Sequence, residues 1–257
     1  MQEAYSNFAA CYDQLMDNIP YDEWFSYLHS LLKEYKIEDG IVAELGCGTG
    51  NITELMAGAG YDMIGIDNSD AMLDIANEKK AENGSSCLYL LQDMREFELY
   101  GTVKAVISLC DSVNYVTDST ELLQVFKLVN NYLDPKGIFI FDFHPRYYYK
   151  EIVADATIAE DRDNISFIWD NYYDDEEDIN ELSLSLFVKE SDGDINHAGI
   201  FRKYEELHLQ RGYTLQEMKD LVAASGMELV AAYDAFTKDV ATEECERIYI
   251  IARECGK

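Results

Sequence analysis

The feature that most limits the fold of this chain is a regular alternation of apolar and amphipathic segments across residues 41–143. The apolar segments are short, and stretches with a helical period near 3.6 separate most of them. Strands that are apolar on both faces and joined by helices form a parallel sheet covered on both sides. With right-handed crossovers, this pattern predicts an open, doubly wound α/β fold. The predicted strands are residues 41–45, 63–67, 87–93, 103–110 and 137–143, and the predicted helices are residues 51–59, 70–81 and 120–133.

A different pattern begins near residue 161. Residues 165–173, 179–189 and 195–209 alternate apolar and polar side chains, with acidic turns between them, which predicts three antiparallel strands. Thr214 and Glu217 then have the spacing of a capping box, which starts a helix. Two more strands are predicted at residues 228–236 and 247–252. The chain is therefore expected to have three parts: a helical segment at residues 1–36, an α/β domain at residues 37–160 and 211–257, and an antiparallel insertion at residues 161–210.

The charge balance excludes several classes of partner. The chain carries 50 acidic against 20 basic residues, a formal net charge of -30, and no Lys/Arg cluster of the kind that tracks phosphates. We therefore expect no binding to nucleic acid or to an anionic membrane surface. No apolar run is long enough to span a bilayer, and no export signal is recognisable. The six cysteines form no CxxC pair, and His29, His197 and His208 lack metal-ligand spacing, so we expect a cytoplasmic protein without a metal site.

The strongest local motif is the segment ELGCGTGN at residues 44–51. It joins a predicted strand to a predicted helix, and its alternating glycines allow a ligand to approach the backbone closely. A dinucleotide fingerprint requires a third glycine at position 51, where this chain has Asn51. An acidic residue, Glu44, precedes the first glycine by two positions. This pattern favours an adenosine that carries an amino-acid tail over a pyrophosphate.

The segment resembles motif I of the class I S-adenosylmethionine (SAM)-dependent methyltransferases, and later segments follow in the order of that family. The resemblance implies a Rossmann-like seven-stranded, mostly parallel sheet with an antiparallel last strand. It also implies that Asp67 holds the ribose hydroxyls, that Met72 flanks the adenine, and that Asp93 and Met94 bind the adenine edge. The loop at residues 108–116 is expected to face the sulfonium and the methyl acceptor. The expected cofactor contacts are Tyr12, Tyr21, Glu44, Gly46, Cys47, Gly48, Gly50, Asn51, Asp67, Asn68, Met72, Asp93, Met94, Cys110, Asp111 and Ser112.

The sequence differs from the motifs of other branches of the family, and these differences narrow the range of possible methyl acceptors. Residues 111–114 read DSVN, whereas amino-methylating DNA enzymes carry (Asp/Asn)-Pro-Pro-(Tyr/Phe/Trp), and Cys110 lacks the preceding proline of the cytosine C5 enzymes. The antiparallel insertion and the aromatic N-terminal segment resemble the small-molecule branch, which includes sugar N-methyltransferases and glycine N-methyltransferase-like enzymes. In that branch the insertion covers the acceptor site, and the N-terminal segment closes over the cofactor. We therefore expect methyl transfer from SAM to N or O of a small molecule, by a monomer or a homodimer.

Two alternatives stay open at this point: a nicotinamide-dependent oxidoreductase, and a SAM-binding regulatory protein without catalysis. Methyl transfer from a sulfonium needs a base only if the acceptor arrives protonated. The candidates for such a base are His144, just after the fifth strand, and Asp111 after the fourth. The family's own bases lie in segments that have no match here, so the resemblance assigns no catalytic residue.

Overall fold

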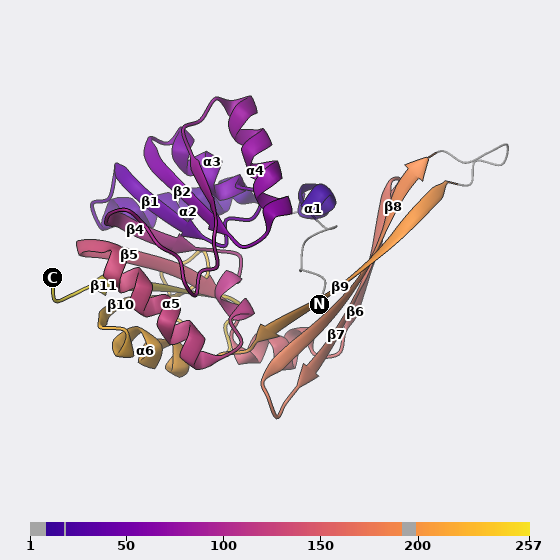
Figure 1. Cartoon of the computed structure of the whole chain (residues 1–257). Helices are drawn as coiled ribbons and strands as arrows, with labels where there is room; N and C mark the ends of the chain where they lie inside the picture. The colour runs from indigo at the N-terminus through magenta and orange to yellow at the C-terminus, as the bar shows by residue number, and fades with distance from the viewer. Residues whose placement is uncertain (1–8, 18, 192–198) are drawn as a thin grey trace.

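The computed structural model of the chain describes residues 9–17, 19–191 and 199–257. Residues 1–8 of the predicted N-terminal segment, His197 and the first residues of the predicted strand 195–209 lie outside the described residues. Figure 1 shows two bodies: an α/β domain built around a twisted sheet, and a long antiparallel ribbon of strands at its side. Within the part of the chain that the structure describes, no helix is both long and apolar enough to cross a bilayer.

The α/β domain contains a seven-stranded sheet in the order β10-β11-β5-β4-β1-β2-β3. Its first five strands in the chain run parallel where they pair, while β11 runs antiparallel to both β5 and β10. The predicted doubly wound fold with an antiparallel last strand is confirmed. The strands are β1 Gly40–Leu45, β2 Tyr61–Asp67, β3 Leu88–Leu91, β4 Val103–Ser108, β5 Leu133–Phe143, β10 Met227–Asp234 and β11 Ile248–Glu254.

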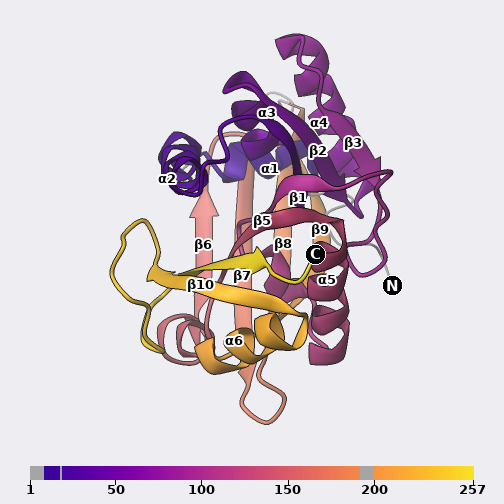
Figure 2. The ribbon, with the colours of Figure 1, turned by 90° about the vertical axis from the view of Figure 1, so that its left-hand side faces the viewer.

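Helices cover both faces of this sheet, as strands with two apolar faces require. Residues of α2 and α3 form one apolar cluster with the sheet, and residues of α5 and α6 form the other. Figure 2 shows these pairs on opposite sides of the sheet, and α4 packs beside α3. The helices are α2 Tyr21–Glu34, α3 Asn51–Gly58, α4 Asp70–Asn83, α5 Ser119–Tyr132 and α6 Leu215–Ala224.

Strand β5 contributes side chains to the apolar clusters on both faces of the sheet. Phe139, Phe141 and Phe143 point to the α5–α6 side, and Ile138 and Ile140 point to the α2–α3 side. All five are almost completely buried. Burying one such side chain stabilises a fold by about 1.5–3 kcal/mol. Strand β5 therefore holds the two helical layers together, and its carboxyl end lies at the edge of the sheet where ligands bind in open α/β folds.

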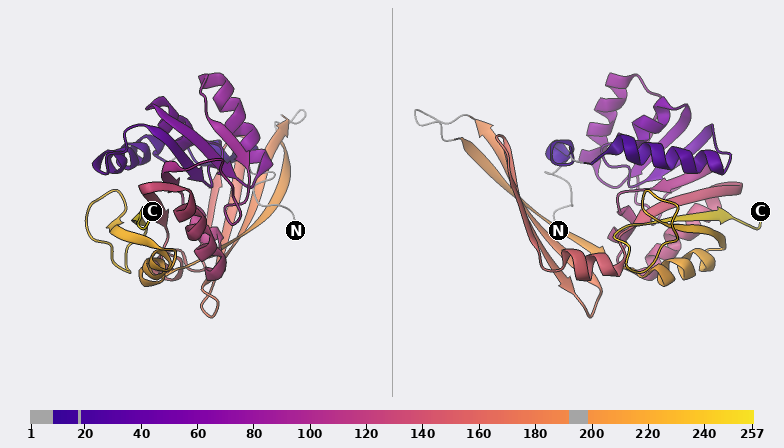
Figure 3. Two further views of the ribbon diagram at one scale, coloured as in Figure 1. Left: turned by 60° about the vertical axis from the view of Figure 1, so that its left-hand side comes forward. Right: turned by 180° about the vertical axis from the view of Figure 1, so that it is seen from behind.

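The insertion has four antiparallel strands in the order β6-β7-β8-β9, where the sequence predicts three. The additional strand β6 was missed because all of its residues are exposed and no apolar alternation marks it. The right-hand view of Figure 3 shows the ribbon standing away from the seven-stranded sheet. The strands are β6 Thr157–Asp161, β7 Ile165–Asp174, β8 Ile179–Ser191 and β9 Ile200–Arg211.

Helix α1 (Ala9–Leu15) fills part of the space between the two bodies (Figure 1). Its buried residues Cys11 and Leu15 pack with Met72 of α4 and with the leucines of β8 in a third apolar cluster. Two short helical turns complete the junction: η1 (Ser112–Tyr115) after β4, and the π-helical η2 (Tyr148–Val153) after β5. Helix α1 is thus anchored between the sheet edge and the insertion.

Candidate functional site

The glycine-rich loop between β1 and α3 keeps its backbone open. Gly46, Gly48 and Gly50 all have positive φ angles, of 70°, 52° and 77°, a region that residues with a Cβ rarely adopt. A Cβ at Gly46 would lie 2.5 Å from the Ser112 Oγ, whereas a Cβ at Gly48 would meet nothing within 4 Å. The space beside Gly48 therefore does not serve internal packing. It is free for a ligand that contacts the backbone.

Two carboxylates stand at the ends of the neighbouring strands. Asp67, at the end of β2, accepts hydrogen bonds from the backbone N–H of Gly48 (2.8 Å) and of Ser69 (2.9 Å). Each of its oxygens retains a lone pair for a further donor. Glu44, in β1, is buried and accepts a hydrogen bond from the Thr53 hydroxyl. Burial and the nearby Asp67 raise the pKa of Glu44 to about 8, and burial also raises the pKa of Asp67.

A cavity of about 330 Å³ joins these groups at the carboxyl end of the sheet, within the size range of small-ligand sites. All but two of the predicted cofactor contacts line it. Gly50 does not, because it caps α3 and packs toward Tyr89, and Asp111 does not, because its side chain turns to other partners. The predicted residues that line the cavity are Tyr12, Tyr21, Glu44, Gly46, Cys47, Gly48, Asn51, Asp67, Asn68, Met72, Asp93, Met94, Cys110 and Ser112.

Sequence reasoning missed further lining residues as individual contacts. Five of them lie beside a motif residue without a signal of their own, and the other three belong to the loop at residues 108–116, which was predicted only as a whole. One of them, Arg95, pairs with Asp93 through Nε (3.0 Å) and Nη2 (2.6 Å), and this pairing lowers the pKa of Asp93. Arg95 also donates to Glu121 at 2.9 Å. The missed lining residues are Thr49, Ile52, Ile66, Gln92, Arg95, Leu109, Tyr115 and Val116.

Helix α1 is tied across the glycine loop by a polar cluster. Asp13 accepts hydrogen bonds from the Thr49 hydroxyl (2.8 Å) and the Asn51 amide (3.0 Å), and it forms an ion pair with Lys79 at 2.6 Å. These contacts lower the pKa of Asp13 despite its partial burial. Neither Asp13 nor Lys79 belongs to a sequence motif that would have predicted this contact. Their contacts hold α1 where Tyr12 can line the cavity.

Phenol groups converge at the end of the cavity next to β4. Tyr12 of α1 and Tyr21 of α2 interact with each other, and both lie near the Cys110 thiol. Burial raises the pKa of all three groups, so at neutral pH they stay uncharged. Neutral, buried side chains therefore line this end of the cavity and separate it from bulk water.

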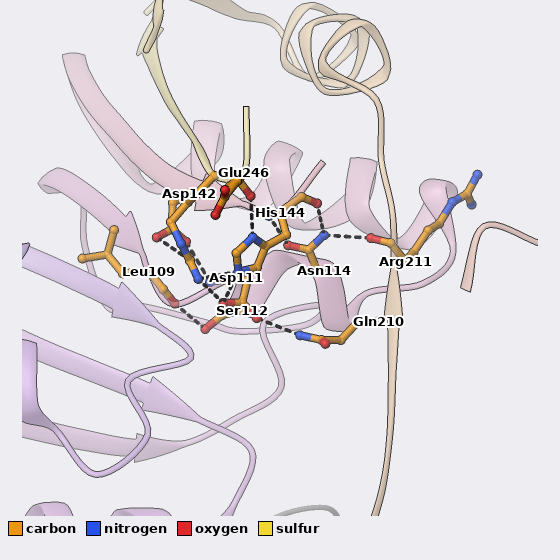
Figure 4. A network of polar contacts seen from close by, with 10 residues as sticks. Leu109, Asp111, Ser112, Asn114, Asp142, His144, Gln210, Arg211 and Glu246 are labelled. Carbon is orange, nitrogen blue, oxygen red and sulfur yellow. Dashed lines mark hydrogen bonds and ion pairs between the residues drawn. The ribbon is translucent and has the colours of Figure 1, made fainter. Parts of the chain in front are cut away.

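The two candidate bases lie in a buried ion-pair network after β4 and β5, where Figure 4 shows Asp111, Asp142 and His144 side by side. Arg247 donates to Asp142 and to Asp111, each at 2.9 Å. It also donates to the His144 Nε2 at 2.6 Å, and the other ring nitrogen of His144 bonds to the Glu246 carbonyl at 2.6 Å. Burial and Arg247 lower the pKa of His144 to about 3.

His144 is therefore a neutral histidine with both nitrogens engaged, and neither it nor Asp111 lines the cavity. The network instead shapes the loop after β4. Cys110 and Asp111 have φ angles of 56° and 51°, a left-handed conformation that costs such residues about 1–3 kcal/mol each. The Asp142 carboxylate fixes this turn by accepting from the Asp111 N–H at 2.7 Å. The geometry assigns these residues to loop structure.

Comparisons with known proteins agree on one family. A family model described as "Methyltransferase domain" matches residues 42–137. The chain is 32% identical over 251 residues to the "Putative methyltransferase YqeM" of Bacillus subtilis (strain 168), covering 97% of each chain. Among solved structures, a SAM-dependent methyltransferase from Clostridium acetobutylicum ATCC 824 matches with a TM-score of 0.86 at 25% identity, over 99% of this chain and 100% of that one. The sugar N-methyltransferase KedS8 from Streptoalloteichus sp ATCC 53650 shares the fold, with a TM-score of 0.74 at 16% identity over 98% and 93% of the two chains.

Proposed function

Since the chain belongs to the class I SAM-dependent methyltransferases, we propose that it transfers the methyl group of SAM to a nitrogen or oxygen atom of a small molecule. SAM is the methyl-donor substrate of this family, and its sulfonium is a good leaving group. The observation that carries the proposal is the cavity at the carboxyl end of the sheet, between the glycine loop and helix α1.

The residues around the cavity fit the parts of SAM. Open space beside Gly48 suits a nucleoside that lies against the backbone, and the lone pairs of Asp67 suit two vicinal hydroxyls. Met72 and Met94 offer apolar surface for the adenine, and Asp93 offers an acceptor for its amino group. The methionine tail would then extend along Glu44, Gly46 and Tyr21. In this orientation the sulfonium lies near Cys110, Ser112 and Tyr115.

The chain contributes alignment and exclusion of water. Methyl transfer is an in-line displacement, and holding two reactants in register can supply about 7 kcal/mol of the barrier or more. Tyr12 from α1 and Tyr115 from η1 border the reacting end from two sides. The anchoring of α1 by Asp13 and the network around Arg247 keep these two elements in place. No charged side chain needs to form a bond with the methyl group.

Three features support a small acceptor. Helix α1 lines the cavity through Tyr12 and packs against the leucines of β8, which limits the room for a polymer on that side. The net charge of -30 repels nucleic acid. The solved sugar N-methyltransferase of the same fold acts on a small molecule by its printed name, which supports the idea by analogy alone. The six free cysteines further support a reducing, cytoplasmic environment.

Two measurements test the proposal. Calorimetry should detect SAM binding and no binding of NAD, whereas a chain that binds only NAD would refute it. A panel of amines, amino sugars and phenols with radiolabelled SAM should then yield a methylated small molecule. If SAM binds but only nucleic acid or protein accepts the label, the small-molecule part of the proposal is wrong.

A further inference from the structure

Strand β9 of the insertion carries polar side chains on its buried face. His208 and Gln210 are 3% and 6% exposed, and the side chain of Glu206 is 4% exposed. The leucines between them, Leu207 and Leu209, are 56% and 42% exposed. This arrangement reverses the usual pattern, in which a half-covered sheet buries its apolar side chains. Because burying polar groups costs free energy unless they find partners, the reversed strand indicates that its polar face has a function.

The buried polar face of β9 reaches the cavity through one tyrosine. The Nε2 of His208 lies 3.3 Å from an oxygen of Glu206, and its Nδ1 lies 3.5 Å from the hydroxyl of Tyr115. The two rings meet edge to face, with centroids 6.0 Å apart. Tyr115 in turn lines the cavity. Contacts of this length are common in catalytic sites before the substrate binds, and they shorten in the reactive complex.

Hydrogen bonds fix the register of β9 against η1, so that His208 lies opposite Tyr115. Gln210 donates to Asp111 at 2.7 Å, and the Asn114 amide donates to the Arg211 carbonyl at 2.7 Å. Figure 4 shows both contacts beside the ion-pair network. The relation between His208 and Tyr115 therefore does not depend on a mobile loop. It is set by two rigid elements, which is the arrangement that precise proton transfer requires.

We propose that Tyr115, with His208 and Glu206 behind it, forms a proton relay that deprotonates the acceptor atom during methyl transfer. This inference rests on the proposed function. An acceptor that arrives as an ammonium N–H or a hydroxyl O–H gives its proton to the Tyr115 oxygen while the phenol proton moves to the Nδ1 of His208. The freed lone pair bonds to the methyl carbon as the carbon–sulfur bond breaks and its electrons go to sulfur. The proton stays on the imidazole, stabilised by the Glu206 carboxylate, until it leaves to solvent.

Tyr115 is the catalytic residue in this scheme, and His208 and Glu206 are positioning residues that act through it. Two further titratable groups near Tyr115, Tyr12 of α1 and Tyr149 of η2, stay neutral because burial raises their pKa. Asp111 lies on the same turn, but Arg247 and Gln210 hold its carboxylate. The Glu206–His208 pair is thus well placed to accept charge when a proton arrives.

A test without a known acceptor uses two nucleosides, S-adenosylhomocysteine and sinefungin. Sinefungin carries an amino group where SAM carries its transferable methyl, so it places an N–H donor at the reacting position. The affinities of both ligands are measured by calorimetry at about pH 8 for the wild type and for Glu206→Gln, His208→Asn and Tyr115→Phe. The matched control is Glu205→Gln, which changes the neighbouring acid on the exposed face of β9.

The relay predicts that each of the three variants weakens sinefungin binding by about three- to tenfold, while S-adenosylhomocysteine affinity changes by less than about twofold. Glu205→Gln should alter neither ligand. An unchanged ratio of the two affinities in Glu206→Gln and His208→Asn would overturn the relay. A wild type that binds neither nucleoside would instead overturn the proposed function, and the relay with it.

Discussion

Replacing Asp67 by alanine tests the proposed orientation of SAM most simply. Both carboxylate oxygens already accept one backbone N–H, from Gly48 at 2.8 Å and from Ser69 at 2.9 Å, and in the proposed orientation their remaining lone pairs accept from the ribose hydroxyls. A hydrogen bond to a charged group contributes about 1.5–3 kcal/mol. Because water partly replaces two such bonds, we expect Asp67→Ala to weaken SAM binding by about 2–3 kcal/mol, or about 30- to 150-fold in Kd.

The assay is isothermal calorimetry, with thermal unfolding as a check on the fold, because Asp67→Ala also removes one hydrogen bond to Gly48 of the glycine loop and one to Ser69 before α4. Asp67→Asn keeps the shape and one acceptor oxygen, so its affinity should fall by an intermediate amount. The control is Asp62→Ala, which removes an exposed acid from the same strand and should leave binding unchanged. If Asp67→Ala and Asp62→Ala bind SAM equally well, the ribose does not lie at Asp67 and the proposed orientation is wrong.

Three further predictions concern buried groups. Folding raises the pKa of Glu44 from 4.5 to about 8, so the folded state binds the extra proton. Glu44 therefore makes the unfolding free energy of the unliganded protein fall by about 1.4 kcal/mol per pH unit between these values, and denaturant unfolding of Glu44→Gln should lack this slope. Arg247→Ala should cost about 3–5 kcal/mol in denaturant unfolding, because it leaves buried carboxylates unpaired. Gly50→Ala should lose about 1–3 kcal/mol in the same assay, because its Cβ would lie 2.5 Å from the Tyr89 hydroxyl at a φ of 77°.

Each of these has a result that would contradict it. Parallel pH profiles of wild type and Glu44→Gln would mean that Glu44 titrates normally in the folded protein. The control for Arg247→Ala is Arg253→Ala, which removes only a cation–π contact with Tyr35. If the two variants are equally stable, the ion-pair network contributes little to the free energy of unfolding. For Gly50, the matched change is Gly58→Ala, where a Cβ meets nothing and φ is ordinary. Equal losses at the two glycines would refute the argument from backbone conformation.

The fold was predictable from sequence wherever a strand buries both of its faces. Such strands leave uninterrupted apolar runs, as in β5, and the helices between them keep their 3.6 period. The short strand β6 leaves no such signal, because all of its residues are exposed and only its pairing with β7 makes it a strand. The antiparallel ribbon was therefore predicted with three strands where it has four.

The site was predictable to the extent that its residues follow one another in the chain. The glycine loop and Asp67 stand at strand ends that the pattern itself marks. Arg247 meets Asp111 across 136 positions in the chain, and Asp13 meets Thr49 across 36. In sequence these are ordinary charged residues, and only the packed fold gives them a role. The same limit explains why His144 and Asp111 looked like free bases, although Arg247 engages both.

A crystal structure of the protein with bound S-adenosylhomocysteine would show whether the nucleoside lies in this cavity. We expect density between α1 and the glycine loop, with the ribose hydroxyls on the Asp67 carboxylate and the sulfur facing Cys110 and Tyr115. Density for the nucleoside elsewhere on the molecule, or in the cavity with its sulfur turned away from Tyr115, would contradict it.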